Sequence, residues 1–199
     1  MLVTMVMHPM GGSIERLQRI AALIMTTHSL AILSVPFAIL GFWGLTKKLE
    51  DSSLLALMAF STMSVGLFAV VCAAAVNGLA LPLFVTHYID APEEKLAAIK
   101  PVLNYNTALN HAFDLVYIGA ACIAVFLWSL AIFRTHQLPA WLGWLGILLG
   151  LTTLVSMSAG FIFFDLTGFR IFVSGFVIWI LCAGIFLRKT PPVEGGVNS

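Results

Sequence analysis

The sequence predicts an all-α integral membrane protein, a bundle of five transmembrane helices, and three observations support this fold class. Hydrophobic residues make up 60% of the 199 residues and charged residues only 10%, whereas about a quarter of an ordinary soluble domain is charged. The mean hydropathy is +1.02. Five apolar stretches also approach or exceed the roughly 20 residues that a helix needs to cross the hydrocarbon core. The lipid bilayer is therefore the first predicted partner of this chain.

The five expected spans follow one another with short breaks. They are residues 20–45, 54–84, 102–133, 141–164 and 171–187. Polar segments with turn-forming residues separate them, such as the run from Lys47 to Ser52 and the turn from Asp165 to Arg170. The chain thus reads as one transmembrane domain, residues 1–199, and we expect residues 1–15 and 190–199 to be flexible tails.

The longest break, between the second and third spans, contains a further helix signal. Asp90-Ala91-Pro92-Glu93 combines a capping residue, a proline early in the first turn and a glutamate three residues after the cap. This pattern predicts a short surface helix in the loop, ending near Ile99.

The orientation of the bundle rests on its basic residues. Side A is the membrane face that holds the N-terminus and the loop of residues 86–101, and side B holds the C-terminus. Each side has five basic residues, so the positive-inside rule does not choose between them. These are Arg16, Arg19, Lys95, Lys100 and Arg170 on side A, and Lys47, Lys48, Arg134, Arg188 and Lys189 on side B. Because the side B cations sit directly at helix ends, we expect side B to be cytoplasmic and the N-terminus extracytoplasmic.

Several function classes find no support in the sequence. The net charge of +1 and the lack of a basic run argue against a nucleic-acid partner. The chain has no phosphate-binding glycine loop and no Gly-x-Ser-x-Gly nucleophile motif. Whether the protein is an enzyme is therefore left undecided.

Glycines in the fourth span predict close helix packing. Gly143, Gly146 and Gly150 recur on one face, and the last two form a small-xxx-small pattern that lets a neighbouring backbone approach. Such a pattern more often packs helices within one chain than between chains. Trp141 and Trp144 lie where an aromatic belt is expected on side B.

Polar residues concentrate in the third span. An arc of about 120° on this helix holds one polar face. The face consists of Asn104, Thr107, Asn110, His111 and Asp114. A central aspartate is disfavoured by about 2.5 to 3.5 kcal/mol on the insertion scale, so we expect Asp114 to face the bundle interior.

The depths of other polar residues match this face. At a rise of about 1.5 Å per residue, His28, His111 and Asn77 fall roughly 10 to 14 Å below side A. We therefore predict a polar cavity that opens toward side A. Its candidate ligand-binding or proton-relay residues are His28, Asn77, Asn110, His111, Asp114 and Tyr117.

Four interpretations of this cluster remain open. The polar groups can simply hydrogen-bond one another and fix helix register. They can bind a small polar ligand or relay protons through His111 and Asp114 in a transporter or membrane enzyme. His28 and His111 can ligate a haem or a metal ion from two facing helices. Lastly, the chain can be an accessory subunit of a larger membrane complex or a homo-oligomer.

The N-terminus adds a separate metal-binding hypothesis. Met5, Met7, His8 and Met10 form a cluster of thioethers around one imidazole, which suits Cu(I). A flexible apolar leader explains the same residues.

The segment between the third and fourth spans resembles a turn found in uncharacterised bacterial multi-spanning membrane proteins. It carries the pattern Leu-Pro-x-Trp-Leu-Gly at residues 138–143, and the start of the first span, residues 16–23, is similar in style to theirs. The resemblance covers about a quarter of the chain. It implies a bacterial inner-membrane location and assigns no catalytic residue.

Overall fold

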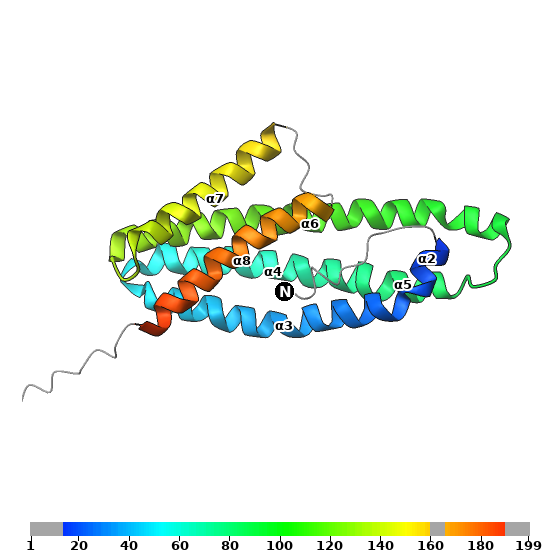
Figure 1. The fold of residues 1–199 in the computed structure, drawn as a ribbon, viewed down its shortest axis with the longest axis horizontal. Coiled ribbons are helices and arrows are strands. Elements are labelled where there is room, and N and C mark those ends of the chain that lie inside the picture. The colour runs from blue at the N-terminus through cyan, green and yellow to red at the C-terminus, as the bar shows by residue number, and fades with distance from the viewer. Residues whose placement is uncertain (1–13, 160–165, 190–199) are drawn as a thin grey trace, which may run out of the picture.

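The computed structural model describes residues 14–159 and 166–189, and all of its regular structure there is helical (Figure 1). Five helical segments are long and apolar enough to cross a membrane. The predicted fold class is therefore confirmed. The cluster from Met5 to Met10 lies outside the described residues, as does the greater part of both expected tails.

The helices occupy the predicted spans with shifted ends. The first span is α3 (Ala21–Lys48), which follows a short α2 (Ile14–Arg19), and a 3-10 turn, η1 (Glu50–Ser52), leads into the second span. The second span is continuous through α4 (Ser53–Ala75), one turn of π-helix, η2 (Val76–Ala80), and α5 (Leu81–Thr86). The remaining spans are α6 (Glu93–Thr135), α7 (Ala140–Ser158) and α8 (Leu166–Lys189).

The loop between the second and third spans differs from the prediction. Residues 93–99 do not form a separate surface helix but the first turns of α6, which runs through Pro101 without a break. Ile99 is buried, and Leu96 and Leu103 are half-buried on the same side of the helix. The apolar face thus continues across the proline, and packing favours one uninterrupted helix.

The length of α6 means that it extends well beyond the bilayer. Its 43 residues measure about 65 Å at 1.5 Å per residue, about twice the hydrocarbon thickness. Even a tilt of about 40° would accommodate only a path of about 40 Å. The 19 residues of α7 measure about 28 Å and fit the hydrocarbon without excess.

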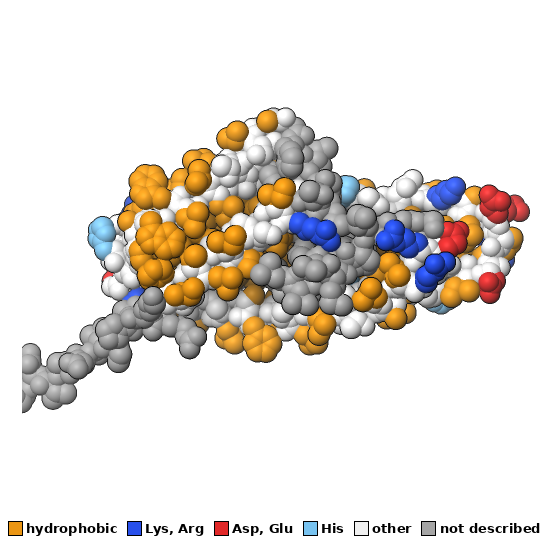
Figure 2. All heavy atoms as spheres, in the orientation of Figure 1, with side chains coloured by type: hydrophobic (Ala, Val, Ile, Leu, Met, Phe, Trp, Pro, Cys, Tyr) orange, Lys and Arg blue, Asp and Glu red, His pale blue; other side chains and the backbone are white. Residues whose placement is uncertain are grey.

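The excess length lies on side A. In Figure 1 the start of α6, together with α2 and α5, projects past the side A ends of α7 and α8. Figure 2 shows acidic and basic side chains gathered on this projecting end, whereas hydrophobic side chains cover the part formed by α7, α8 and the side B half of the bundle. The projecting end is therefore suited to water and the remainder to lipid.

Cysteine accessibility tests this boundary. In a variant with Cys72, Cys122 and Cys182 replaced by alanine and placed in nanodiscs, we expect Thr107→Cys to react with a membrane-impermeant maleimide. Ile123 on the same helix is 54% exposed, but Ile123→Cys should stay unlabelled, because we expect lipid to cover it. Equal labelling of the two cysteines would contradict the boundary.

Aromatic rings join α3, α6 and α8 in the side B half. Trp128 of α6 stacks on Phe42 of α3 with ring centroids 5.2 Å apart and on Trp179 of α8 at 6.2 Å. The indole N–H of Trp128 donates to Thr46 Oγ1 at 3.3 Å, and that of Trp179 donates to the Leu142 carbonyl at 3.0 Å. Both indoles thus bury their rings and still satisfy their polar atoms.

The glycine face of α7 packs against α6, as predicted from its spacing. Gly143, Gly146 and Gly150 are buried. A Cβ added to Gly143 would lie 2.8 Å from the Phe133 ring, and one added to Gly146 would overlap Ser129 Oγ. The contacts are intramolecular, which confirms the expected use of this pattern.

Candidate functional site

Four polar side chains form one hydrogen-bonded series between the second and third spans. Nδ2 of Asn106 donates to Oδ1 of Asn77, and Nδ2 of Asn77 donates to Oδ1 of Asn110. Nδ2 of Asn110 in turn donates to Oδ2 of Asp114 at 2.9 Å. These four residues are called the polar row. Every amide donates in the same direction, toward the carboxyl group of Asp114.

The helix geometry explains how the row forms. Asn106, Asn110 and Asp114 are spaced by four residues on α6 and so lie one above another on a single stripe. Asn77 comes from η2 and inserts its amide between the first two. A π-helical turn carries an extra residue relative to an α-helix and is frequent at functional sites.

The other side of η2 rests on His28. Gly78 is buried, and a Cβ placed on it would overlap Cβ and Cγ of His28. His28 is itself buried on α3, with Nδ1 2.8 Å from the Ile24 carbonyl oxygen of its own helix. The absence of a side chain at Gly78 therefore lets α3 support the turn that presents Asn77.

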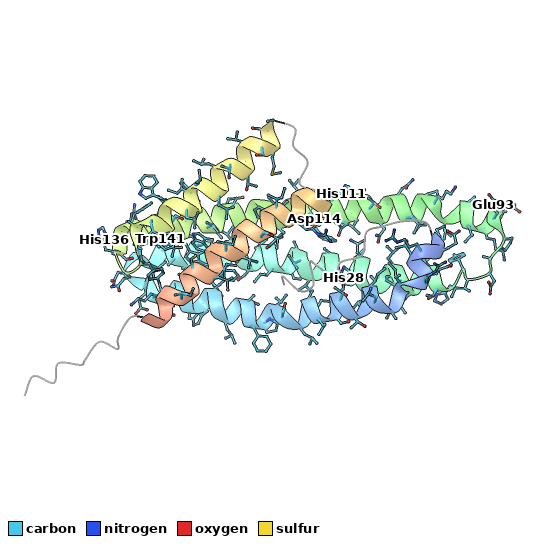
Figure 3. All side chains as sticks on the ribbon, viewed as in Figure 1. His28, Glu93, His111, Asp114, His136 and Trp141 are labelled. Carbon is cyan, nitrogen blue, oxygen red and sulfur yellow. The ribbon has the colours of Figure 1, made fainter. Side chains whose placement is uncertain are left out.

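The remaining residues of the predicted polar face are less enclosed. Asn104 and Thr107 are exposed, and the Thr107 hydroxyl donates to the Leu103 carbonyl of its own helix at 3.1 Å. His111 is half-buried one turn before Asp114, which is also half-buried (Figure 3). The structure thus brings Asn77, Asn110 and Asp114 together and leaves Asn104 and Thr107 outside the row.

Tyr117 belongs to a different environment. It is only 1% exposed and packs edge-on against Phe172 and Phe176 of α8, with ring centroids 6.0 and 6.4 Å apart. It also lines an apolar cavity of about 300 Å³ between α3 and α8. Tyr117 therefore lies with the aromatic core rather than with the row.

The two candidate haem-ligating histidines lie on opposite sides of η2 (Figure 3). Gly78 of η2 meets His28 on α3, and Asn77 of η2 bonds Asn110, the residue before His111 on α6. Within residues 14–159 and 166–189, no three His, Cys, Asp or Glu side chains gather into a group that could hold a metal ion. The geometry gives more support to the row than to a bis-histidine centre.

Asn106 is the member of the row that sequence reasoning missed. It falls about 40° outside the predicted arc of about 120°, which runs from Asn104 to Asn110. The signal was the four-residue spacing of Asn106, Asn110 and Asp114. Each four-residue step rotates about 40° beyond a full turn of the helix, so three residues at this spacing stay on one stripe.

Helix lengths place the row near the side A edge of the hydrocarbon. Counted from the side B ends of α3, α4 and α6, the residues His28, Asn77 and Asp114 lie about 30 to 36 Å away. The hydrocarbon core is about 30 Å thick, and α7 and α8 have their side A ends close to the level of Asp114 (Figure 3). Asp114 therefore lies near the side A edge of the hydrocarbon rather than at its centre.

Neither a protein-family model, nor a curated protein, nor a solved structure matches this chain. The resemblance at residues 138–143 stays a prediction.

Proposed function

We propose that this multi-pass membrane protein binds a small polar ligand at the Asp114 end of the polar row, from side A. The observation that carries the proposal is the series of three carboxamides that ends on a single carboxyl group. A carboxylate accepts hydrogen bonds at two oxygens, and Asn110 occupies Oδ2. The ligand that suits the other oxygen carries a positive charge or hydrogen-bond donors.

Ligand binding has more support than proton relay. A carboxamide offers two N–H donors and a carbonyl acceptor but, unlike imidazole or a carboxyl group, it does not titrate near neutral pH. Three of the four members of the row are carboxamides, so the row itself offers no proton path beyond Asp114, and a relay would have to run through His111 and Asp114 instead. The same groups are well suited to orient a polar ligand.

Ligand-dependent stability tests the proposal. A panel of small ammonium compounds and zwitterions is added to the purified protein, and unfolding is followed by circular dichroism. At a hundredfold excess over its dissociation constant, a bound ligand stabilises the fold by about 2.7 kcal/mol. We expect this gain in the wild type and in Thr107→Ala, whose hydroxyl lies outside the row, and its loss in Asp114→Asn.

A different result would reject ligand binding at Asp114. If no member of the panel stabilises the wild type, while Asn77→Ala and Asp114→Asn both lower stability, the row only joins two helices. In that case binding at Asp114 is rejected.

We also propose that the protein resides in a bacterial inner membrane with side B in the cytoplasm. The support is the resemblance at residues 138–143 and the position of Lys47 and Lys48 at the end of α3. A reporter enzyme that is active only in the cytoplasm, fused after Ser199, should be active.

A further inference from the structure

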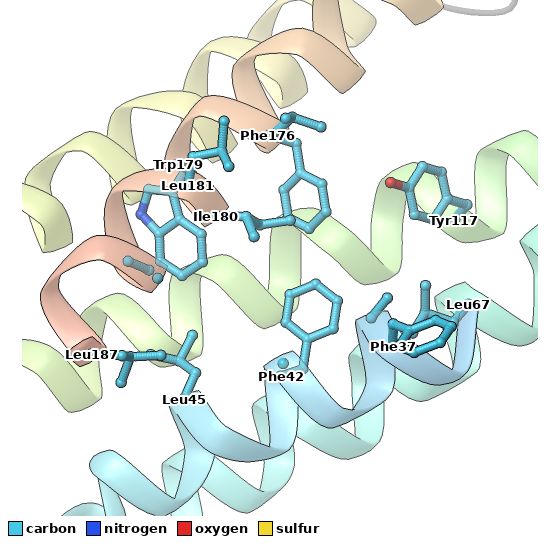
Figure 4. A pocket seen from close by; sticks show the side chains of 15 residues that line it. Phe37, Phe42, Leu45, Leu67, Tyr117, Phe176, Trp179, Ile180, Leu181 and Leu187 are labelled. Atoms are coloured by element: carbon cyan, nitrogen blue, oxygen red, sulfur yellow. The ribbon is translucent and has the colours of Figure 1, made fainter. Parts of the chain in front are cut away.

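A slot separates α3 from α8 in the side B half of the bundle. Its volume is about 300 Å³, and it is lined by residues from Phe37 to Leu45 on α3 and from Phe176 to Leu187 on α8. Leu67 and Tyr117 form its floor on the side of α4 and α6 (Figure 4). The slot is distinct from the polar row, which has none of its residues in the lining.

Small residues keep the slot open. Ala38 and Gly41 line it from α3, and Ala183 and Gly184 line it from α8. A Cβ added to Gly41 or Gly184 would meet no atom within 4 Å. Glycines in membrane helices usually allow close approach of a neighbour, as on α7, but these two border unfilled space.

The walls of the slot suit a hydrocarbon chain. Phe42, Phe176 and Trp179 present aromatic rings, and the indole N–H of Trp179 is already used by the Leu142 carbonyl. The Tyr117 hydroxyl points from the inner end toward Phe176 (Figure 4). Apart from this hydroxyl, the labelled side chains offer carbon surface to an occupant.

The position of the slot identifies the source of such a chain. From Leu45 to Phe37 it extends about 12 Å along α3, which is comparable to one leaflet of about 15 Å. Its side B end lies next to the last turn of α3, which contains Lys47 and Lys48. Lys47 binds Glu50 at 2.7 Å, and Lys48 is half-buried.

We propose that the slot binds an anionic phospholipid of the side B leaflet. One acyl chain occupies the space between Gly41 and Gly184, and the phosphate group lies at Lys48 in the last turn of α3. Basic residues at a membrane surface attract anionic lipids, and the apolar walls accept the chain. The acyl chain fills the space between α3 and α8 that side chains leave unfilled. The lipid thereby completes the packing of α8 against α3.

Lipid retention tests the proposal. The full chain is reconstituted in phosphatidylcholine vesicles with a minor fraction of phosphatidylglycerol of the same acyl chains, extracted gently, and its bound lipids are identified by native mass spectrometry. We expect about a fivefold preference for phosphatidylglycerol. Gly41→Phe and Gly184→Phe fill the slot from opposite walls and should abolish retention.

Two further variants separate the parts of the proposal. Gly44→Phe is the matched control, because Gly44 lies on α3 outside the lining and has open space around it; it should retain the lipid. The Lys48→Gln protein should retain phosphatidylcholine and phosphatidylglycerol equally, because it has lost the preference for the anionic headgroup.

Defined outcomes overturn the assignment. Retention in Gly41→Phe and Gly184→Phe that equals retention in Gly44→Phe means that the slot is not the binding site. Equal retention of both lipids by the wild type means that the headgroup is not recognised. Lys48→Gln leaves the packing of the slot intact, so its preference remains readable if either phenylalanine variant fails to fold.

Discussion

Gly78→Ala should lower the unfolding free energy by about 3 kcal/mol, the upper end of the usual cost of overpacking. The added methyl group would overlap Cβ and Cγ of His28, which are close to the backbone and cannot swing aside. Relief requires η2 to move away from α3. Since η2 carries Asn77, the same movement would withdraw its amide from between Asn106 and Asn110, so ligand binding at Asp114 should weaken as well.

A double variant isolates this contact. In Gly78→Ala combined with His28→Gly, the space for the methyl group returns, and we expect a coupling energy of about 2 kcal/mol. Gly119→Ala is the matched control, because its added Cβ meets nothing within 4 Å; it should gain up to about 1 kcal/mol from helix propensity. A Gly78→Ala protein as stable as the Gly119→Ala protein would show that η2 does not depend on this contact.

Trp128→Ala should cost about 3 kcal/mol, measured by unfolding in mixed micelles. Trp128 is fully buried between Phe42 and Trp179, and it donates a hydrogen bond to Thr46. In soluble cores a Phe or Trp to Ala change costs about 3 to 5 kcal/mol. The lower end applies here, because an unfolded helix in lipid stays in apolar surroundings and the lost packing accounts for most of the effect.

Trp144→Ala provides the comparison for Trp128→Ala. Trp144 is 65% exposed on α7 and touches only one ring in the aromatic contacts of the described residues, that of Phe133 at 5.1 Å. We expect a loss below about 1 kcal/mol. Similar losses for the two variants would mean that the stacked rings do not hold α3, α6 and α8 together.

The five spans could be predicted because the bilayer imposes their length and apolarity. Their ends were harder to place, since a helix that leaves the membrane can continue in water on a packed face. This is what α6 does from Glu93 onward, through Pro101. The hydropathy of the sequence indicates which residues lie in the hydrocarbon core. The start of the helix depends instead on the burial of residues such as Ile99.

The candidate site was predicted in part. Asn77, Asn110 and Asp114 stood out by residue type and depth, but Asn106 depended on a π-helical turn that changes which face of the second span meets α6. Tyr117 was grouped by its hydroxyl, whereas its ring decides its position among Phe172 and Phe176. Glycine spacing on α7 indicated contact, yet the same residue type at Gly41 borders open space, and only the neighbouring helix distinguishes the two.

The unequal halves of α6 also bear on how the chain enters the membrane during synthesis. Because the apolar half of α6 follows Asp114, we expect that half to be the segment recognised for insertion, with the aspartate at its edge rather than at its centre, where it would cost about 3 kcal/mol. The half that starts at Glu93 lies on side A of Asp114 and is anchored to the second span through η2. Pairing of Asn77 with Asn106 and Asn110 becomes available only when both spans are in place, so these bonds form late and favour one alignment of the two helices.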